Sequence, residues 1–103
     1  MLVIAACKSD PLPYWAKCGD LNWLTNIERS IIKAGFKGAI VYAWRDHGEV
    51  FFEVLPCTTN CADVGSTVYD CSGKQVCYGG GFSGISTCVY TDGPLDLVVV
   101  WKN

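Results

Sequence analysis

The apolar positions in the first half of the chain recur every three or four residues, which is the pattern of an amphipathic helix. They form one stripe, made of Leu21, Leu24, Ile27, Ile31 and Ala34. Asp20 precedes the stripe and can accept hydrogen bonds from the free N–H groups of a first helical turn. Gly35 follows it and suits the left-handed conformation in which many helices end. The pattern predicts a helix of about four turns, with Glu28, Arg29 and Lys33 largely off the buried stripe.

The hydrophobic period then changes to two, as in β-strands. Residues 38–44 (GAIVYAW) and 49–55 (EVFFEVL) are rich in β-branched and aromatic side chains and flank the polar segment RDHG. This predicts a hairpin with a four-residue turn. The faces expected to pack on the helix carry Ile40, Tyr42 and Trp44 on the first strand and Val50, Phe52 and Val54 on the second.

Further β segments follow Pro56. Residues 66–70 and 75–78 flank CSGK and predict a second, short hairpin, while residues 95–101 (LDLVVVW) predict a closing apolar strand. The expected fold class is therefore α+β. One N-terminal amphipathic helix packs on a mostly antiparallel sheet, and the C-terminal half is stapled by disulfides.

The first nineteen residues are expected to lie outside this domain. Residues 8–19 contain Pro11 and Pro13, which disfavour regular structure, and they predict a tether or loop. The predicted organisation is a lipobox-like segment and tether over residues 1–19, followed by a single small domain over residues 20–103.

Cysteine usage departs most from that of ordinary proteins. The chain has 103 residues and seven cysteines, a density that in small domains indicates disulfide bonds and an oxidising compartment. An odd count leaves one thiol over. Cys7 accounts for it, because Ile-Ala-Ala-Cys at residues 4–7 looks like a bacterial lipobox, in which this cysteine is lipidated. Since only six residues precede Cys7, the alternative is that residues 2–6 form an ordinary apolar strand.

The other cysteines are enough for three disulfides, and they are Cys18, Cys57, Cys61, Cys71, Cys77 and Cys88. The sequence leaves their pairing open, although a Cys71–Cys77 bond is disfavoured because these residues do not face each other across the second hairpin. A zinc site is the alternative for Cys57 and Cys61, whose spacing suits zinc ligands. It lacks a second pair at similar spacing, and His47 is the single histidine. We therefore expect disulfides and no metal.

The charge distribution and the glycine motif each argue against a class of ligand. The net charge is −2 and the eight Lys and Arg residues are scattered along the sequence, so nucleic-acid binding is not expected. Gly79, Gly81 and Gly84 spell G-x-G-x-x-G, but a dinucleotide site needs a helix directly after this motif. Residues 85–90 are β-prone instead. We expect a tight loop, no nucleotide and no cofactor.

The aromatic residues supply the candidates for partner binding. The chain has four Trp, five Tyr and four Phe, most of which we expect in the core. Tyr14 and Trp15 lie in a proline-flanked loop and suit an exposed anchor for a partner. Trp44, Arg45 and His47 at the first hairpin tip are further candidates. Neither a C-x-x-C motif nor a recognisable acid–base pair is present, so no catalytic residues are assigned and no enzyme activity is expected.

The order of motifs from Trp23 to Asn103 is distinctive. It comprises a tryptophan-led helix, the hairpin VYAWRDHGEVFFEV, the pair Cys57 and Cys61, VYD at 68–70 followed by Cys77, GGFSG at 80–84, and a closing segment that ends in Trp-Lys. This order resembles a group of small, uncharacterised, cysteine-rich bacterial lipoproteins typical of Bacteroidetes. The resemblance implies a domain of the cell envelope with no established activity.

The sequence therefore predicts a non-enzymatic envelope domain, lipid-anchored through Cys7 in the outer membrane or periplasm, or secreted. Its expected partners are the membrane, through the anchor, and a protein, peptide or glycan. The alternative function is a small disulfide-stabilised protease inhibitor, because a stapled domain can present a rigid loop as a substrate mimic. The loops expected to do this are residues 57–65 and the glycine segment.

Overall fold

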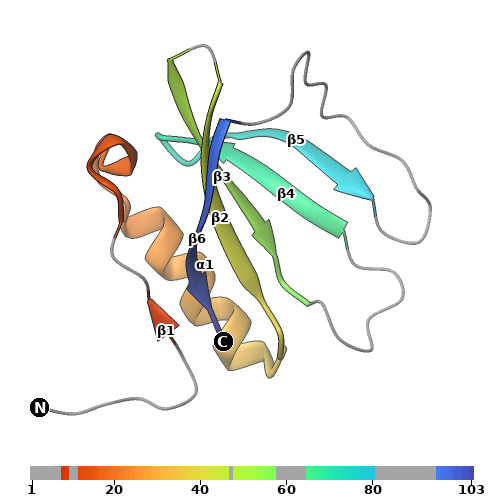
Figure 1. The fold of residues 1–103 in the computed structure, drawn as a ribbon. Helices are drawn as coiled ribbons and strands as arrows, with labels where there is room; N and C mark the ends of the chain where they lie inside the picture. The colour runs from red at the N-terminus through yellow and green to blue at the C-terminus, as the bar shows by residue number, and fades with distance from the viewer. Residues whose placement is uncertain (1–7, 10–11, 47, 58–64, 81–94) are drawn as a thin grey trace, which may run out of the picture.

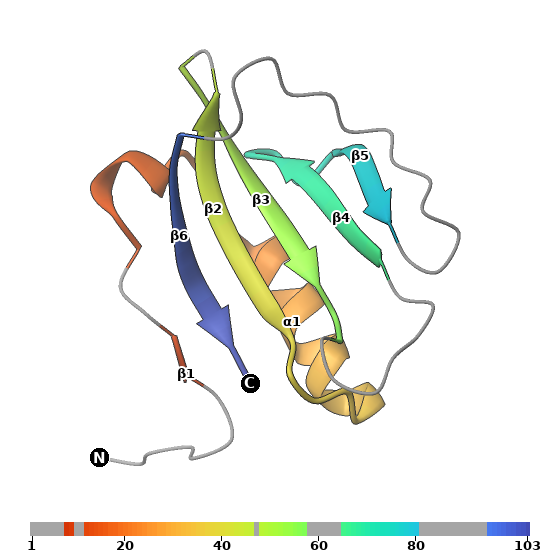
Figure 2. The ribbon, with the colours of Figure 1, turned by 45° about the vertical axis from the view of Figure 1, so that its right-hand side comes forward.

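The computed structural model describes residues 8–9, 12–46, 48–57, 65–80 and 95–103. One helix, α1 (Asn22–Ala34), lies across one face of an antiparallel sheet (Figures 1 and 2). The predicted α+β class and the antiparallel sheet are confirmed. The N-terminal placement of the helix is wrong, because a strand, β1 (Lys8–Ser9), and a 3-10 helix, η1 (Tyr14–Ala16), precede it.

In the described part of the chain, six strands form the sheet in the order β1-β6-β2-β3-β4-β5, and every neighbouring pair is antiparallel. Their remaining bounds are β2 Ile40–Asp46, β3 Glu49–Leu55, β4 Gly65–Asp70, β5 Gln75–Gly80 and β6 Leu95–Lys102. The predicted tether thus contributes an edge strand and a helical turn. Pro13 does not prevent the turn, because its φ of −62° is compatible with a helix start.

The ends of α1 follow the sequence signals closely. The Asp20 carboxylate accepts a hydrogen bond from the Asn22 backbone N–H at 2.9 Å, and Gly35 ends the helix with a φ of 82°. Leu24 and Ile31 are buried in the core, with Leu21 and Ile27 packed against it. The predicted helix and its apolar stripe are confirmed, except that Ala34 is exposed.

Glu28 departs from the predicted polar face of α1, because its side chain is half-buried whereas Arg29 and Lys33 are exposed. Burial raises the pKa of Glu28 from 4.5 to about 7. A carboxyl whose pKa is raised by folding stabilises the protein while it is protonated. Its contribution is complete below pH 4.5 and is lost as the pH rises through about 7.

Glu28→Gln is therefore expected to stabilise the protein at about pH 8 and to change little near pH 4.5. Glutamine keeps the shape of the protonated acid without its titration. We expect a gain of about 1 kcal/mol at the higher pH, allowing for the solvent-exposed part of the side chain. Urea unfolding of both proteins at the two pH values measures it. A gain that is equal at both values would contradict the burial of an ionisable carboxylate.

The core lies between α1 and the central strands. Val41 and Ala43 of β2 are fully buried there, in register with Val54 and Phe52 of β3. The expected face of β2 is therefore wrong: Ile40, Tyr42 and Trp44 lie on the side away from the helix, since side chains alternate along a strand. Period-two alternation specifies two faces, but it does not say which one the helix covers. The expected face of β3 is confirmed for Phe52 and Val54.

Both hairpins are confirmed. Asp46 pairs with Glu49 across β2 and β3, so the strands of the first hairpin continue further than expected, whereas the four residues 71–74 connect β4 and β5 as expected. The last pairs of the first hairpin were assigned to a turn because their side chains are polar. Gly79 and Gly80 belong to β5, so the glycine motif begins inside a strand. Residues 81–84 of that motif, like residues 58–64, lie outside the described residues.

A disulfide joins the segment before α1 to the turn between β4 and β5. Cys18, between η1 and α1, is bonded to Cys71 in the β4–β5 turn, 53 residues later. Stapling is therefore not confined to the C-terminal half, and the disfavoured Cys71–Cys77 bond is absent. Cys57 and Cys77 are also disulfide-bonded. Cys7, Cys61 and Cys88 lie outside the described residues.

Candidate functional site

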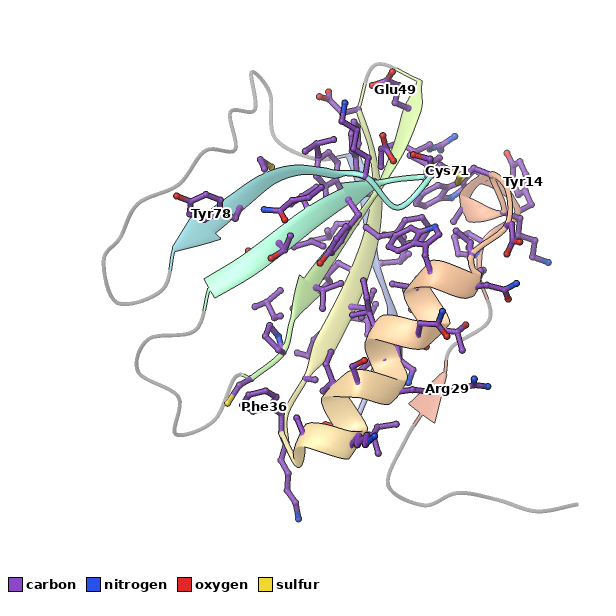
Figure 3. All side chains as sticks on the ribbon, turned by 180° about the vertical axis from the view of Figure 1, so that it is seen from behind. Tyr14, Arg29, Phe36, Glu49, Cys71 and Tyr78 are labelled. Atoms are coloured by element: carbon purple, nitrogen blue, oxygen red, sulfur yellow. A yellow bond between two sulfur atoms is a disulfide. The ribbon has the colours of Figure 1, made fainter. Side chains whose placement is uncertain are left out.

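The most exposed large hydrophobic side chain that the structure describes is Tyr14, which is 85% exposed. It is the first residue of η1, a turn closed by a hydrogen bond from the Ala16 N–H to the Pro13 carbonyl at 2.9 Å. Ala16 is fully buried in the core. The turn is therefore anchored in the core through Ala16, while Tyr14 projects from it into solvent (Figure 3).

Trp15, the next residue of η1, is half-buried and packs against the core. The Arg45 guanidinium of β2 lies 4.8 Å from the centre of its ring, in a cation–π contact. This contact ties η1 to the end of the β2–β3 hairpin. The structure thus brings Tyr14, Trp15 and Arg45 together, as three of the predicted partner-binding residues.

The Cys18–Cys71 disulfide is a further connection in the same region. It connects the segment after η1 to the β4–β5 turn, with the two Cα atoms 6.0 Å apart. A hollow of about 430 Å³ opens beside it, lined by Cys18, Gly19, Asp20, Cys71 and Ser72. We call Tyr14, Trp15, Arg45, Trp23 and this disulfide the aromatic corner.

The β4–β5 turn is ordered by one carboxylate. Asp70 Oδ1 accepts hydrogen bonds from the Ser72 hydroxyl at 2.6 Å, the Ser72 N–H at 2.9 Å and the Lys74 N–H at 3.0 Å. The Ser72 hydroxyl bond is the main cause that lowers the pKa of Asp70 below its ordinary value. Asp70 therefore acts as a turn cap that stays ionised, which keeps Cys71 in place.

Trp23 connects this turn to the helix. Its indole Nε1–H donates a hydrogen bond to the Cys71 carbonyl at 3.0 Å. Its ring packs edge-on against the Phe52 ring, with 5.7 Å between the ring centres, and tilted against the Tyr69 ring, with 5.3 Å between the ring centres. Gly73 covers the ring so closely that a Cβ there would come within 2.7 Å of it. The aromatic corner is therefore held together by contacts among η1, α1, β2 and the β4–β5 turn.

Two predicted partner-binding residues are placed elsewhere. Trp44 is 2% exposed and stacks on Phe51 with the ring centres 4.7 Å apart. The expectation that it is exposed is wrong, because β2 continues past it to Asp46 and places it within the sheet rather than at the tip. His47 lies outside the described residues. The sequence reasoning missed Trp23, Asp70 and Gly73, for which a Trp at a helix start and the turn sequence DCSGK are the available signals.

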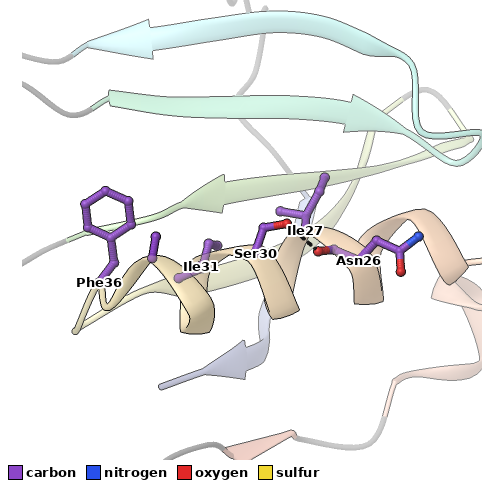
Figure 4. Close-up of a pocket in the computed structure, with 6 residues that line it drawn as sticks. Asn26, Ile27, Ser30, Ile31 and Phe36 are labelled. Carbon is purple, nitrogen blue, oxygen red and sulfur yellow. Dashed lines mark hydrogen bonds between the residues drawn. The ribbon is translucent and has the colours of Figure 1, made fainter.

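A second hollow, of about 420 Å³, runs along α1 and ends at Phe36 (Figure 4). Its other lining residues are Asn26, Ile27, Ser30, Ile31 and Ala34. The Ser30 hydroxyl donates to the Asn26 carbonyl at 2.9 Å, so this polar group is used within the helix. The lining has no titratable side chain, and it offers a surface for apolar contact.

The chemistry of the aromatic corner is that of recognition by contact. It combines an exposed phenol, a cation held over an indole and a carboxylate used as a cap. Among the described residues, no group of three or more His, Cys, Asp or Glu residues is placed to hold a metal ion. None of the helices in the described ranges has the length and apolar character that a membrane span requires. Comparison of the chain with protein-family models, curated proteins and solved structures found no match.

Proposed function

We propose that the chain is a non-enzymatic domain of the bacterial cell envelope that binds a protein, peptide or glycan through the aromatic corner. The observation that carries this proposal is the exposure of Tyr14 on a turn that is packed against the core. A tyrosine presents a large amphipathic surface, and such residues are enriched among those that dominate binding energy. Because η1 is fixed by the core and flanked by a disulfide, little conformational entropy is lost on binding.

The proposed location has separate support. A disulfide between distant segments favours an oxidising compartment, and the lipobox-like residues 4–7 favour a lipid anchor on Cys7. The resemblance to Bacteroidetes lipoproteins agrees with both. We further propose that Cys57, Cys61, Cys77 and Cys88 form two more bonds, which staple the C-terminal half. The bonded state of Cys57 and Cys77 supports this.

Tyr14→Ala is expected to weaken ligand binding about 30-fold, the effect of losing a central anchor residue. The change leaves the core intact, because the side chain is exposed. Protein purified from the host membrane fraction is screened against peptide and glycan arrays, and the Kd of each hit is measured for the wild type and the variant. Tyr78→Ala on β5, which also removes a partly exposed tyrosine, is the matched control.

Hits that bind both variants as tightly as the wild type would contradict the role of the corner. The intact mass of the same preparation, before and after reduction, tests the anchor and the disulfides. Lipidation is expected to raise the mass of the mature chain, and reduction to add two hydrogens per disulfide. An unmodified Cys7 would remove the anchor from the proposal.

A further inference from the structure

Three basic residues recur every four positions toward the end of α1. Arg29, Lys33 and Lys37 are exposed on the C-terminal half of α1 and in the segment that follows it. Three of the eight Lys and Arg residues of the chain are therefore grouped near the end of the helix.

Asn103 holds the segment that carries Phe36 and Lys37 in place. Its side-chain Nδ2 donates to the Phe36 carbonyl at 3.0 Å, and its Oδ1 accepts from the Ala39 N–H at 3.2 Å. A backbone bond from the Asn103 N–H to the Ala39 carbonyl, at 3.1 Å, completes the connection. The end of β6 and the segment after α1 are therefore held together by three hydrogen bonds.

Two apolar side chains are exposed among these cations. Ile32 is 46% exposed and Phe36 is 42% exposed. They alternate in sequence with Lys33 and Lys37, so each apolar side chain is followed by a cation. We call Arg29, Ile32, Lys33, Phe36 and Lys37 the basic end.

The described side-chain carboxylates lie away from this end, except one. Asp46 and Glu49 close the β2–β3 hairpin, at the far end from Arg29 and Phe36 (Figure 3). Asp20 and Asp70 belong to the aromatic corner region, and Glu53 lies within β3. Glu28 is the described carboxylate of α1, and it is half-buried. A chain with a net charge of −2 thus presents a locally cationic surface.

We propose that the basic end is a membrane contact, which rests on an anionic phospholipid surface with Ile32 and Phe36 at the lipid–water boundary. Lysines interleaved with exposed apolar side chains are the composition of interfacial binding surfaces. A linear anionic polymer would use the cations but would leave the two apolar side chains without a function. β1, which pairs with Lys102 and Trp101 at this end, begins one residue after Cys7. The contact needs no acyl chain.

The test uses the full chain with Cys7→Ser, which cannot be acylated, and co-sedimentation with vesicles at low salt. Binding is expected with vesicles of phosphatidylcholine and phosphatidylglycerol, and not with phosphatidylcholine alone. Lys33→Gln combined with Lys37→Gln is expected to weaken binding about 25-fold, or about fivefold per lysine. The matched control, Lys17→Gln with Lys74→Gln, changes the net charge equally at exposed positions away from the basic end and is expected to cost less than twofold.

Equal losses in the two double variants, or no binding to the anionic vesicles, would overturn the proposal. Retention on dextran sulfate without vesicle binding would also overturn it and would indicate a polymer site. Phe36→Ser is expected to weaken vesicle binding while leaving the response to added salt unchanged, because it removes no charge. Circular dichroism of each variant establishes that it is folded. Because the anchor is absent, failure here leaves the proposed lipidation and the aromatic corner untouched.

Discussion

Replacing Cys18 and Cys71 together with serine is expected to lower the free energy of unfolding by about 4 kcal/mol. The bond closes a loop of 53 residues, and a cross-link of this length restricts the unfolded chain by about that amount. The native state of the variant loses little else, because the Trp23 hydrogen bond to the Cys71 carbonyl involves the backbone. Urea unfolding followed by tryptophan fluorescence measures the change.

The double substitution isolates one bond, which chemical reduction does not do, because Cys57 and Cys77 are also disulfide-bonded. A decrease in the free energy of unfolding below about 1 kcal/mol would be far smaller than the loop-closure effect. It would show that Trp23 and Asp70 hold the corner without the cross-link. Binding offers a second readout. If the bond stabilises the presentation of Tyr14, the variant is expected to bind the ligand more weakly even under conditions where it is fully folded.

The local signals in the sequence were sufficient for α1 and for strands β2 to β6, but they missed β1 and η1 and did not determine which face of β2 the helix covers. The helix between Asp20 and Gly35 was predictable because its apolar period and both of its ends are encoded locally. That Val41 and Ala43 face the helix, and Trp44 does not, was not predictable, because alternation is symmetric between the two sides of a strand. Which side α1 covers depends on long-range packing.

The candidate site was predictable in part for the same reason. Tyr14 and Trp15 stood out as aromatics in a proline-flanked loop, and the structure shows that one is exposed and the other is packed. The pairing of Trp15 with Arg45 needs residues that are 30 positions apart to meet. The basic end was missed although Arg29, Lys33 and Lys37 recur every four residues, because the sequence does not show that Ile32 and Phe36 are exposed beside them.

The two surfaces lie at opposite ends of the molecule, which gives the proposals a shared consequence. Tyr14 and Cys71 are at one end and Phe36 is at the other (Figure 3). If the basic end rests on the membrane, the aromatic corner is directed away from it. A rigid corner held by Cys18–Cys71 then displays its tyrosine toward a partner in the surrounding compartment rather than toward lipid.

Gly73→Ala is expected to lower the free energy of unfolding by about 3 kcal/mol, the sum of two costs. The residue has a φ of +89°, which costs an L-residue about 1 kcal/mol. The new Cβ would also lie 2.7 Å from Trp23 Cγ and 2.9 Å from Cδ2, and relieving such an overlap in a packed site costs about 2 kcal/mol. Thermal or urea unfolding measures the total.

Gly48→Ala separates the two costs. Gly48 has a similar φ of +80°, and a Cβ there meets nothing within 4 Å, so only the backbone cost of about 1 kcal/mol is expected. In a Trp23→Ala background, Gly73→Ala is expected to cost no more than Gly48→Ala, because the overlapping ring is gone. A Gly73→Ala cost that persists without Trp23 would place the constraint in the Asp70-capped turn itself. The position of the Trp23 indole would then depend on the turn, and the indole would not determine the turn's conformation.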